Sequence, residues 1–225
     1  HLLHGEAEPD AETKARLRFG RSASSALSPE VQSAFESRFD LPIIETMGLT
    51  ETAAQILSNP LPPGIRKIGS PGIAFGNEVA ILGPDLTPCP PDVEGEIVVR
   101  GPNVMLEYLK NPDATSSSFT GDWLRTGDLG RKDADGYLHF AARNDDMIIS
   151  SGYNIAGPEV EAALLSHPDV CECAVIGVPD EARGALVQAH IVLNDGIAND
   201  AATVKALQDH VKNTIAPFKY PRSVV

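Results

Sequence analysis

The sequence predicts a mixed α/β fold that ends in an α+β domain, with a β-rich part over residues 1–144 and a compact domain over residues 145–225. Two patterns indicate this division. Short apolar runs separated by glycine, proline and aspartate fill the middle of the chain, as expected of a small antiparallel sheet or barrel. After Arg143, strand-like runs alternate with amphipathic helical runs. We therefore place the domain boundary at Asn144 or Asp145.

Composition limits the classes of function. The chain has 225 residues, of which 42% are hydrophobic, enough for one large hydrophobic core or two modest ones. Its net charge of −13 argues against a nucleic-acid partner, because a phosphate backbone favours a basic surface. Three cysteines, no signal peptide and no apolar run near the ~18 residues of a membrane span predict a cytoplasmic protein without a membrane partner.

The N-terminal region is predicted to contain two helices and a small-residue loop. Residues 1–19 are charged and helical in pattern, and residues 21–26 (RSASSA) are small and polar. Ser28 is a suitable N-cap and Pro29 a suitable first residue for the second helix. The serines are typical of an ordinary strand-to-helix loop, and equally of a shelf where backbone approaches a flat ring.

A short strand over residues 41–45 leads into the run MGLTET at residues 47–52. A glycine turn followed by a hydroxyl and a carboxylate suits a phosphate with its magnesium ion. Thr50 would donate to a phosphate oxygen and Glu51 would bind the cation. The same short pattern also occurs as a plain helix cap.

Residues 123–161 contain the strongest local signal. Short strands over residues 130–132 and 137–140 flank Asp135-Gly136, a common two-residue hairpin turn. The hairpin brings Asp128 and Arg143 to adjacent strand ends, where a carboxylate can accept hydrogen bonds from two vicinal ribose hydroxyls and a guanidinium can assist. Taken alone, a hairpin with a flanking arginine is also ordinary structure.

The final domain shows a regular order of elements. A strand over residues 147–149 precedes a helix that begins at Gly157-Pro158, with acidic residues in its first turn. Two further strands and a helix follow, over residues 171–178, 186–193 and 201–215. Irregular chain over residues 58–76 and strands over residues 78–82 and 95–100 complete the preceding part.

Taken together and in order, these motifs resemble the C-terminal portion of the acyl- and aryl-CoA synthetases of the adenylate-forming superfamily. The resemblance rests on the serine shelf, MGLTE, EGEIVVRGPNVMLEYLKNP, WLRTGDLG, ARNDDMIISSGYNIAGPEVE, CAVIGVPDEARG and APFKYPR. It implies the end of a large AMP-binding domain with a barrel-like subdomain, followed by a small mobile domain. It also implies an ATP-dependent acid–CoA ligase that uses Mg²⁺ and coenzyme A.

The resemblance assigns roles to individual positions. Thr50 would touch phosphate and Glu51 would bind magnesium, and both count as catalytic. Asp128 would hold the ribose hydroxyls with help from Arg143. The implied nucleotide-binding set is Ser24, Ser25, Ala26, Met47, Gly48, Thr50, Asp128 and Arg143.

The small domain carries the remaining implied roles. Asp145 matches the hinge about which the domain swings between adenylation of the acid and transfer to the thiol. Ser151 and Gly152 would line the tunnel for the pantetheine arm of coenzyme A.

Two departures and two absences accompany the resemblance. Met47 replaces the usual aromatic residue, and Ser151 replaces a usual glycine. No phosphate loop precedes residue 20, and the sequence stops at Val225, before the family's terminal lysine. We expect a fragment that is inactive alone; a natural short homologue is the alternative. A non-catalytic AMP- and CoA-binding homologue, or a domain that loads a carrier protein, remains open.

The acid substrate is the least determined feature. Residues 21–82 resemble ligases for small dicarboxylic acids such as oxalate, whereas the small domain resembles aryl-acid ligases. The expected partner is a small organic acid of one of these two types, and homodimerisation is left open.

Overall fold

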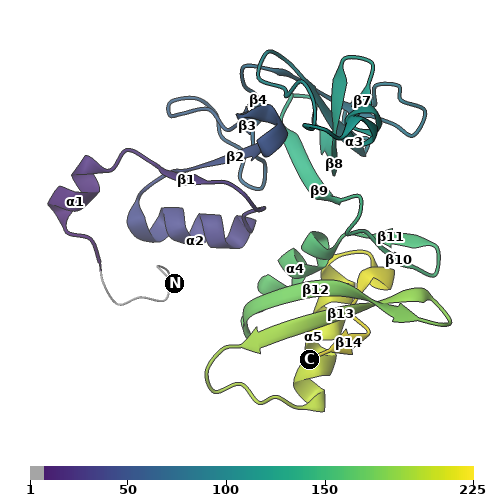
Figure 1. The fold of residues 1–225 in the computed structure, drawn as a ribbon. Helices are drawn as coiled ribbons and strands as arrows, with labels where there is room; N and C mark the ends of the chain where they lie inside the picture. Colours follow the sequence, from purple (N-terminus) through teal and green to yellow (C-terminus); the bar gives the residue numbers. More distant parts are fainter. Residues whose placement is uncertain (1–7) are drawn as a thin grey trace. The chain divides into compact units, whose positions relative to one another are not determined.

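A computed structural model describes residues 8–225 and divides the chain into two compact units (Figure 1). The first unit ends at Phe140 and the second runs from Ala141 to Val225. The helical expectation for residues 1–19 is met only by α1 (Ala11–Arg16), and residues 1–7 lie outside the described part. The mixed fold class predicted from the sequence is confirmed.

A four-stranded sheet in the first unit carries the serine-rich loop. Its order is β1 (Gly20–Ser22), β2 (Ile43–Leu49), β3 (Ala54–Ser58) and β4 (Ile73–Ala74). β1 and β2 are parallel and therefore need a crossover, which α2 (Pro29–Phe39) supplies. The Ser28 side chain accepts a hydrogen bond from the Val31 amide, so the predicted helix start is confirmed.

An antiparallel sheet forms the rest of the first unit. Its strands, in spatial order, are β5 (Glu78–Leu82), β6 (Gly95–Arg100), β8 (Trp123–Lys132) and β7 (Phe119–Thr120), and β9 (Leu138–Arg143) also pairs with β8. The short helix α3 (Pro112–Ser117) begins at an Asn111 cap. The core beneath this sheet contains Ile56, Leu57, Ile81, Ile97, Val99, Leu124 and Leu138.

The second unit is an α+β domain with its own core. Its sheet runs β11 (Tyr153–Ile155), β10 (Ile148–Ser150), β13 (Gly184–Leu193) and β12 (Val170–Asp180), and β14 (Ser223–Val224) pairs in parallel with β13. The helix α4 (Gly157–Leu165) packs against β12 and α5 (Ala201–Thr214). Both helices present the apolar residues expected of them, including Val160, Leu164, Leu207 and Val211.

Two short helical turns complete the described chain. These are η2 (Thr50–Thr52) after β2 and η3 (Pro217–Lys219) after α5. Between residues 8 and 225 no helix combines the length and the apolar character that crossing a bilayer requires.

Candidate nucleotide site

The Thr126-Gly127-Asp128 motif forms a bulge in β8. Glu96 pairs with Leu129 and Val98 pairs with Arg125, so Ile97 alone faces all three motif residues. An uninterrupted antiparallel ladder would place one residue there, and the strand therefore holds two additional residues. Gly127 has a φ of 75°, in the left-handed region where glycine lacks the Cβ clash of other residues.

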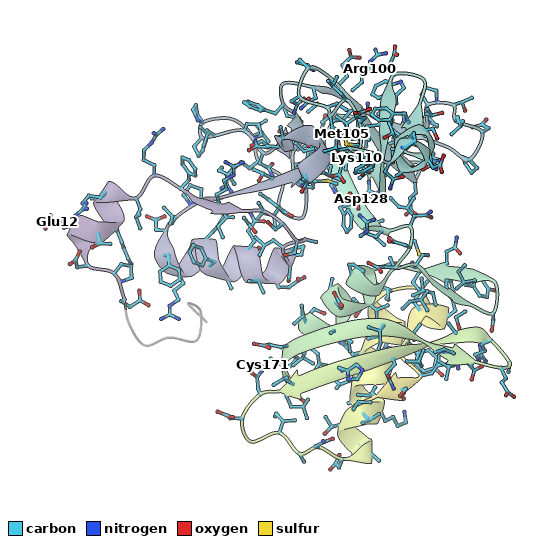
Figure 2. The ribbon with its side chains drawn as sticks, in the orientation of Figure 1. Glu12, Arg100, Met105, Lys110, Asp128 and Cys171 are labelled. Carbon is cyan, nitrogen blue, oxygen red and sulfur yellow. The ribbon has the colours of Figure 1, made fainter. Side chains whose placement is uncertain are left out.

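Side chains take over the hydrogen bonds that the bulge removes from the ladder. The Thr126 hydroxyl donates to the Ile97 carbonyl (2.7 Å) and accepts from the Asp128 amide (3.1 Å). The Gly127 amide donates to Glu96 Oε1 (3.3 Å). Thr126 and Asp128 are both buried, and Asp128 is labelled in Figure 2. The motif is thus a fixed turn within a strand rather than a loose loop.

A second candidate element is the turn that follows β2. The Thr52 hydroxyl donates to the Leu49 carbonyl (3.0 Å) and accepts from the Leu49 amide (3.2 Å). Thr52 therefore caps the N-terminus of the turn. Thr50 is exposed and Glu51 is half-buried. The side chains of Thr50 and Glu51, which the sequence predicts to bind phosphate and magnesium, are not needed to cap the turn.

A loop that is distant in sequence holds Glu51 in place. The Tyr108 hydroxyl donates to Glu51 Oε1 (2.8 Å), and the Met105 amide donates to the Glu51 carbonyl (2.7 Å). The hydrogen bond to Glu51 raises the pKa of Tyr108, and burial adds to this shift. Sequence reasoning missed Tyr108, because no local pattern links residues 57 positions apart.

The serine shelf follows β1 directly. Ser24, Ser25 and Ala26 are exposed, and Ser24 has a φ of 78°. Because β1 and β2 are parallel, the shelf and the turn that begins at Thr50 follow strands ending at the same edge of the sheet. Met47 and Gly48 lie in the second half of β2, where a register irregularity separates them.

Glu45 is a buried carboxyl beside this shelf that the sequence did not single out. Its Oε1 accepts from the Leu27 amide (3.3 Å), immediately after Ala26. Its Oε2 has no hydrogen-bond partner among the described residues. Burial raises the pKa of Glu45, and the single hydrogen bond from Leu27 only partly opposes this shift.

A short-range ion pair lies near the start of the second unit, between Arg143 at the end of β9 and Asp145 in the link to β10. Arg143 Nε donates to Asp145 Oδ1 (2.9 Å), and Arg143 Nη2 to Asp145 Oδ2 (3.4 Å). These hydrogen bonds hold the pKa of Asp145 below its usual range. Asp128 belongs to the first unit and Arg143 to the second, so their action on one ligand stays a prediction.

Ser151 and Gly152 form the turn between β10 and β11. Their φ values are 51° and 81°, and a Cβ added at Gly152 would meet no atom within 4 Å among the described residues other than its chain neighbours. Gly152 is therefore required by backbone conformation and not by crowding within the chain. Arg183 Nη1 donates to the Ser151 hydroxyl (3.0 Å), and the Ser151 amide donates to the Arg183 carbonyl (2.8 Å).

The second unit also contains a stacked aromatic pair and a partly buried ion pair. The rings of Tyr153 and Phe218 stack with centroids 4.4 Å apart. Lys219 Nζ contacts Glu159 Oε1 at 2.7 Å. Lys219 is thus engaged with a carboxylate of α4.

The chain thus combines a sheet-rich unit that carries the Thr-Gly-Asp bulge with an α+β unit. Residues 1–109 match the AMP-binding enzyme family, and residues 159–225 match the AMP-binding enzyme C-terminal domain. The chain belongs to the AMP-binding enzyme family.

Similar proteins are known by sequence and by structure. A sulfoacetate–CoA ligase of Cupriavidus necator is 47% identical over 216 residues, which are 96% of this chain and 42% of that protein. An oxalate–CoA ligase of Arabidopsis thaliana is 38% identical over 225 residues, 100% of this chain and 42% of its own length. The crystal structure of an ATP-bound RpMatB–BxBclM chimera superimposes with a TM-score of 0.93 at 33% identity, covering 100% of this chain and 44% of the chimera. The chain thus spans less than half the length of these relatives.

Proposed function

We propose that this chain carries the nucleotide-binding and thiol-binding surfaces of an ATP-dependent acid–CoA ligase. In the first step a carboxylate oxygen attacks the α-phosphorus of ATP, the bond to pyrophosphate breaks and an acyl-adenylate forms. In the second step the thiol of coenzyme A attacks the acyl carbon and AMP leaves. The observation that carries the proposal is the buried Asp128 held in a fixed bulge, in a chain of the AMP-binding family.

Asp128 is proposed to bind the ribose. Its carboxylate accepts hydrogen bonds from the two vicinal hydroxyls, and each such charge-assisted bond contributes roughly 1.5–3 kcal/mol. Arg143 is proposed to assist. The exposed shelf at Ser24, Ser25 and Ala26 offers the adenine a flat surface with little side-chain bulk.

Thr50 and Glu51 are proposed to serve the phosphates. Thr50 donates from its exposed hydroxyl, and Glu51 offers a carboxylate oxygen to Mg²⁺, which favours one or two carboxylates together with substrate phosphates. The Tyr108 hydroxyl donates to Glu51 Oε1, so the carboxylate that would hold the ion is held in place by a hydrogen bond. When bound, the magnesium ion neutralises charge on the phosphate oxygens.

The second unit is proposed to handle coenzyme A. Asp145 serves as the hinge, because it is exposed and lies in the link between β9 and β10. Ser151 and Gly152 line the path of the pantetheine arm. The proposed reaction has two chemically unlike steps at one acyl carbon. Rotation of the small domain would change which residues surround that carbon between the steps.

The proposed substrate is a small organic acid, and a short acid with a second acidic group is favoured over an aryl acid. Support comes from the relatives named for sulfoacetate and oxalate, each a two-carbon acid with a second anionic group. A panel of short diacids, sulfoacetate and benzoates tested with the intact ligase would distinguish the two types. Faster turnover of a benzoate than of every short diacid would contradict this preference.

The ribose role is tested by titrating the 225-residue chain with AMP in a calorimeter. We expect Asp128→Ala to weaken AMP binding by at least about tenfold, because two charge-assisted hydrogen bonds are lost. Asp92→Ala is the matched control, since Asp92 pairs with Arg131 on the surface of the first unit. Failure of the wild-type chain to bind AMP, or equal binding by Asp128→Ala, would overturn the proposal.

A further inference from the structure

Glu96 is the side chain that bridges the bulge in β8. It lies on β6 at the last paired position before the irregularity, opposite Leu129. Its Oε2 accepts from Arg125 Nε (2.9 Å) and Nη2 (2.7 Å), and its Oε1 accepts from the Gly127 amide (3.3 Å). The Glu96 side chain is 17% exposed, whereas the Arg125 side chain is 42% exposed. One carboxylate thus holds both the residue before the bulge and the residue at its centre.

The bulge needs this support because its central residue is a glycine. Gly127 has more accessible backbone conformations than any other residue type, and it adopts a φ of 75° here. Asp128 follows it directly, so the backbone dihedrals of Gly127 set the direction in which the Asp128 side chain leaves the strand. Thr126 donates to the Ile97 carbonyl and accepts from the Asp128 amide, so its hydroxyl is engaged on either side of Gly127. The Gly127 amide is held by Glu96.

We infer that Glu96 is a positioning residue for the Asp128 carboxylate, which it directs toward the two ribose hydroxyls through the Gly127 amide and Arg125. The inference rests on the proposed ribose role of Asp128. In this proposal Glu96 acts through its hydrogen bonds to Arg125 and to the Gly127 amide. Its effect is on geometry: a displacement of about 1 Å at a binding group is enough to lose most of a hydrogen bond's contribution.

A neighbouring ion pair provides a matched control. Glu78 and Arg100 are directly opposite each other on β5 and β6, and Arg100 Nη2 contacts Glu78 Oε2 at 2.6 Å. The ladder between these strands is continuous over the five pairs from Glu78–Arg100 to Leu82–Glu96. The same type of acid–arginine pair therefore lies in the same sheet without a bulge to support.

The test compares AMP with 2′,3′-dideoxy-AMP, which lacks both ribose hydroxyls. The 225-residue chain is titrated calorimetrically with each nucleotide, as wild type, Glu96→Ala, Glu96→Gln and Glu78→Ala. We expect the wild type and Glu78→Ala to prefer AMP by about tenfold or more. Glu96→Ala is expected to reduce this preference to about threefold or less, while its affinity for the dideoxy nucleotide stays within about twofold of wild type. Glu96→Gln keeps an oxygen for the Gly127 amide and should retain an intermediate preference.

The outcomes separate positioning from a structural role. Equal loss of affinity for both nucleotides in Glu96→Ala, or an unchanged preference, would overturn the inference. If Glu96→Ala fails to fold, Glu96→Gln carries the test, and a wild-type preference in that variant overturns it. A wild-type chain without any preference for AMP contradicts the ribose role of Asp128 instead, so the two failures are distinguishable.

Discussion

Gly127 lies at the centre of the candidate site, and its backbone conformation predicts a measurable cost of substitution. With a φ of 75° it occupies a region in which a Cβ approaches the following carbonyl oxygen. We expect Gly127→Ala to lower the free energy of unfolding of the first unit by about 1–2 kcal/mol, as measured by urea denaturation.

A second glycine provides the control for this measurement. Gly20 lies in β1, and a Cβ added there would meet Ile43 Cγ1 at an ordinary 3.6 Å. Gly20→Ala should leave stability unchanged or slightly raised, because alanine reduces the entropy of the unfolded chain. Equal stability of Gly127→Ala and wild type would show that the bulge accepts a side chain without strain.

Some side chains of the candidate site could be identified from local sequence motifs, and others could not. Asp128 was recognisable because it follows Thr-Gly beside a hairpin signal, and Thr50 and Glu51 because they follow a strand and a glycine. Tyr108 and Glu96 carry no such local signal. Each acts through a contact with a residue far along the chain, 57 positions for Tyr108 and 31 for Glu96. Only the folded chain brings these partners together.

At the level of elements, the turn between β8 and β9 is fastened by a charged cluster. Asp133 Oδ1 accepts from the Asp135 and Tyr137 amides (3.0 and 2.9 Å), and Lys67 Nζ contacts Asp133 Oδ2 at 2.7 Å. Burial acts to raise the pKa of Asp133, but hydrogen bonds from Lys67, His139 and the Tyr137 amide outweigh it and hold the pKa well below the usual range. The cluster ties the irregular chain at Lys67 to the hairpin.

This cluster predicts a pH-dependent stability. Because the folded pKa of Asp133 is depressed, its contribution is present above the ordinary value of 3.8 and is lost as pH falls below it. We expect Asp133→Asn to lower the thermal midpoint by several degrees at pH 7 and by less at pH 3. Lys67→Met should show the same trend, since it removes one of the hydrogen bonds responsible. A penalty for Asp133→Asn that is equal at both pH values would contradict the assignment.

The helices and strands predicted from the sequence agree best with the structure where local residue types define where an element begins or ends. The start of α2 at Ser28 and Pro29 could be predicted from the sequence, because an N-cap and a first-turn proline are local signals. The bulge in β8 could not be predicted in this way. Two additional residues leave the alternation of inward and outward side chains unchanged on either side, so the hydrophobic pattern of the strand looks uninterrupted.

At the level of the whole molecule, the two units have separate hydrophobic cores. Leu57 is buried in the core of the first unit and Leu164 in that of the second. A domain with its own core can unfold as its own cooperative unit. The compact units divide after Phe140, within β9, and the domain boundary that the sequence predicts at Asn144 or Asp145 stays a prediction.

Separate cores predict separable transitions in differential scanning calorimetry. Leu164→Ala should destabilise the transition of the second unit by about 2–5 kcal/mol and leave the other unchanged, because it opens a cavity in only one core. Leu57→Ala is the reciprocal control and should shift the other transition. A single transition shifted equally by both substitutions would show that the units unfold as one.

The even number of additional residues in β8 restricts how homologous chains can vary in length. Leu124 before the bulge and Gly130 after it both lie on the buried side of the strand. Deletion of one residue between Arg125 and Leu129 would invert this order and turn Arg131 toward the core, whereas deletion of two would preserve it. Loss of two residues therefore preserves the inward and outward pattern of this strand, and loss of the pair Gly127-Asp128 would also remove the carboxylate that we propose binds the ribose.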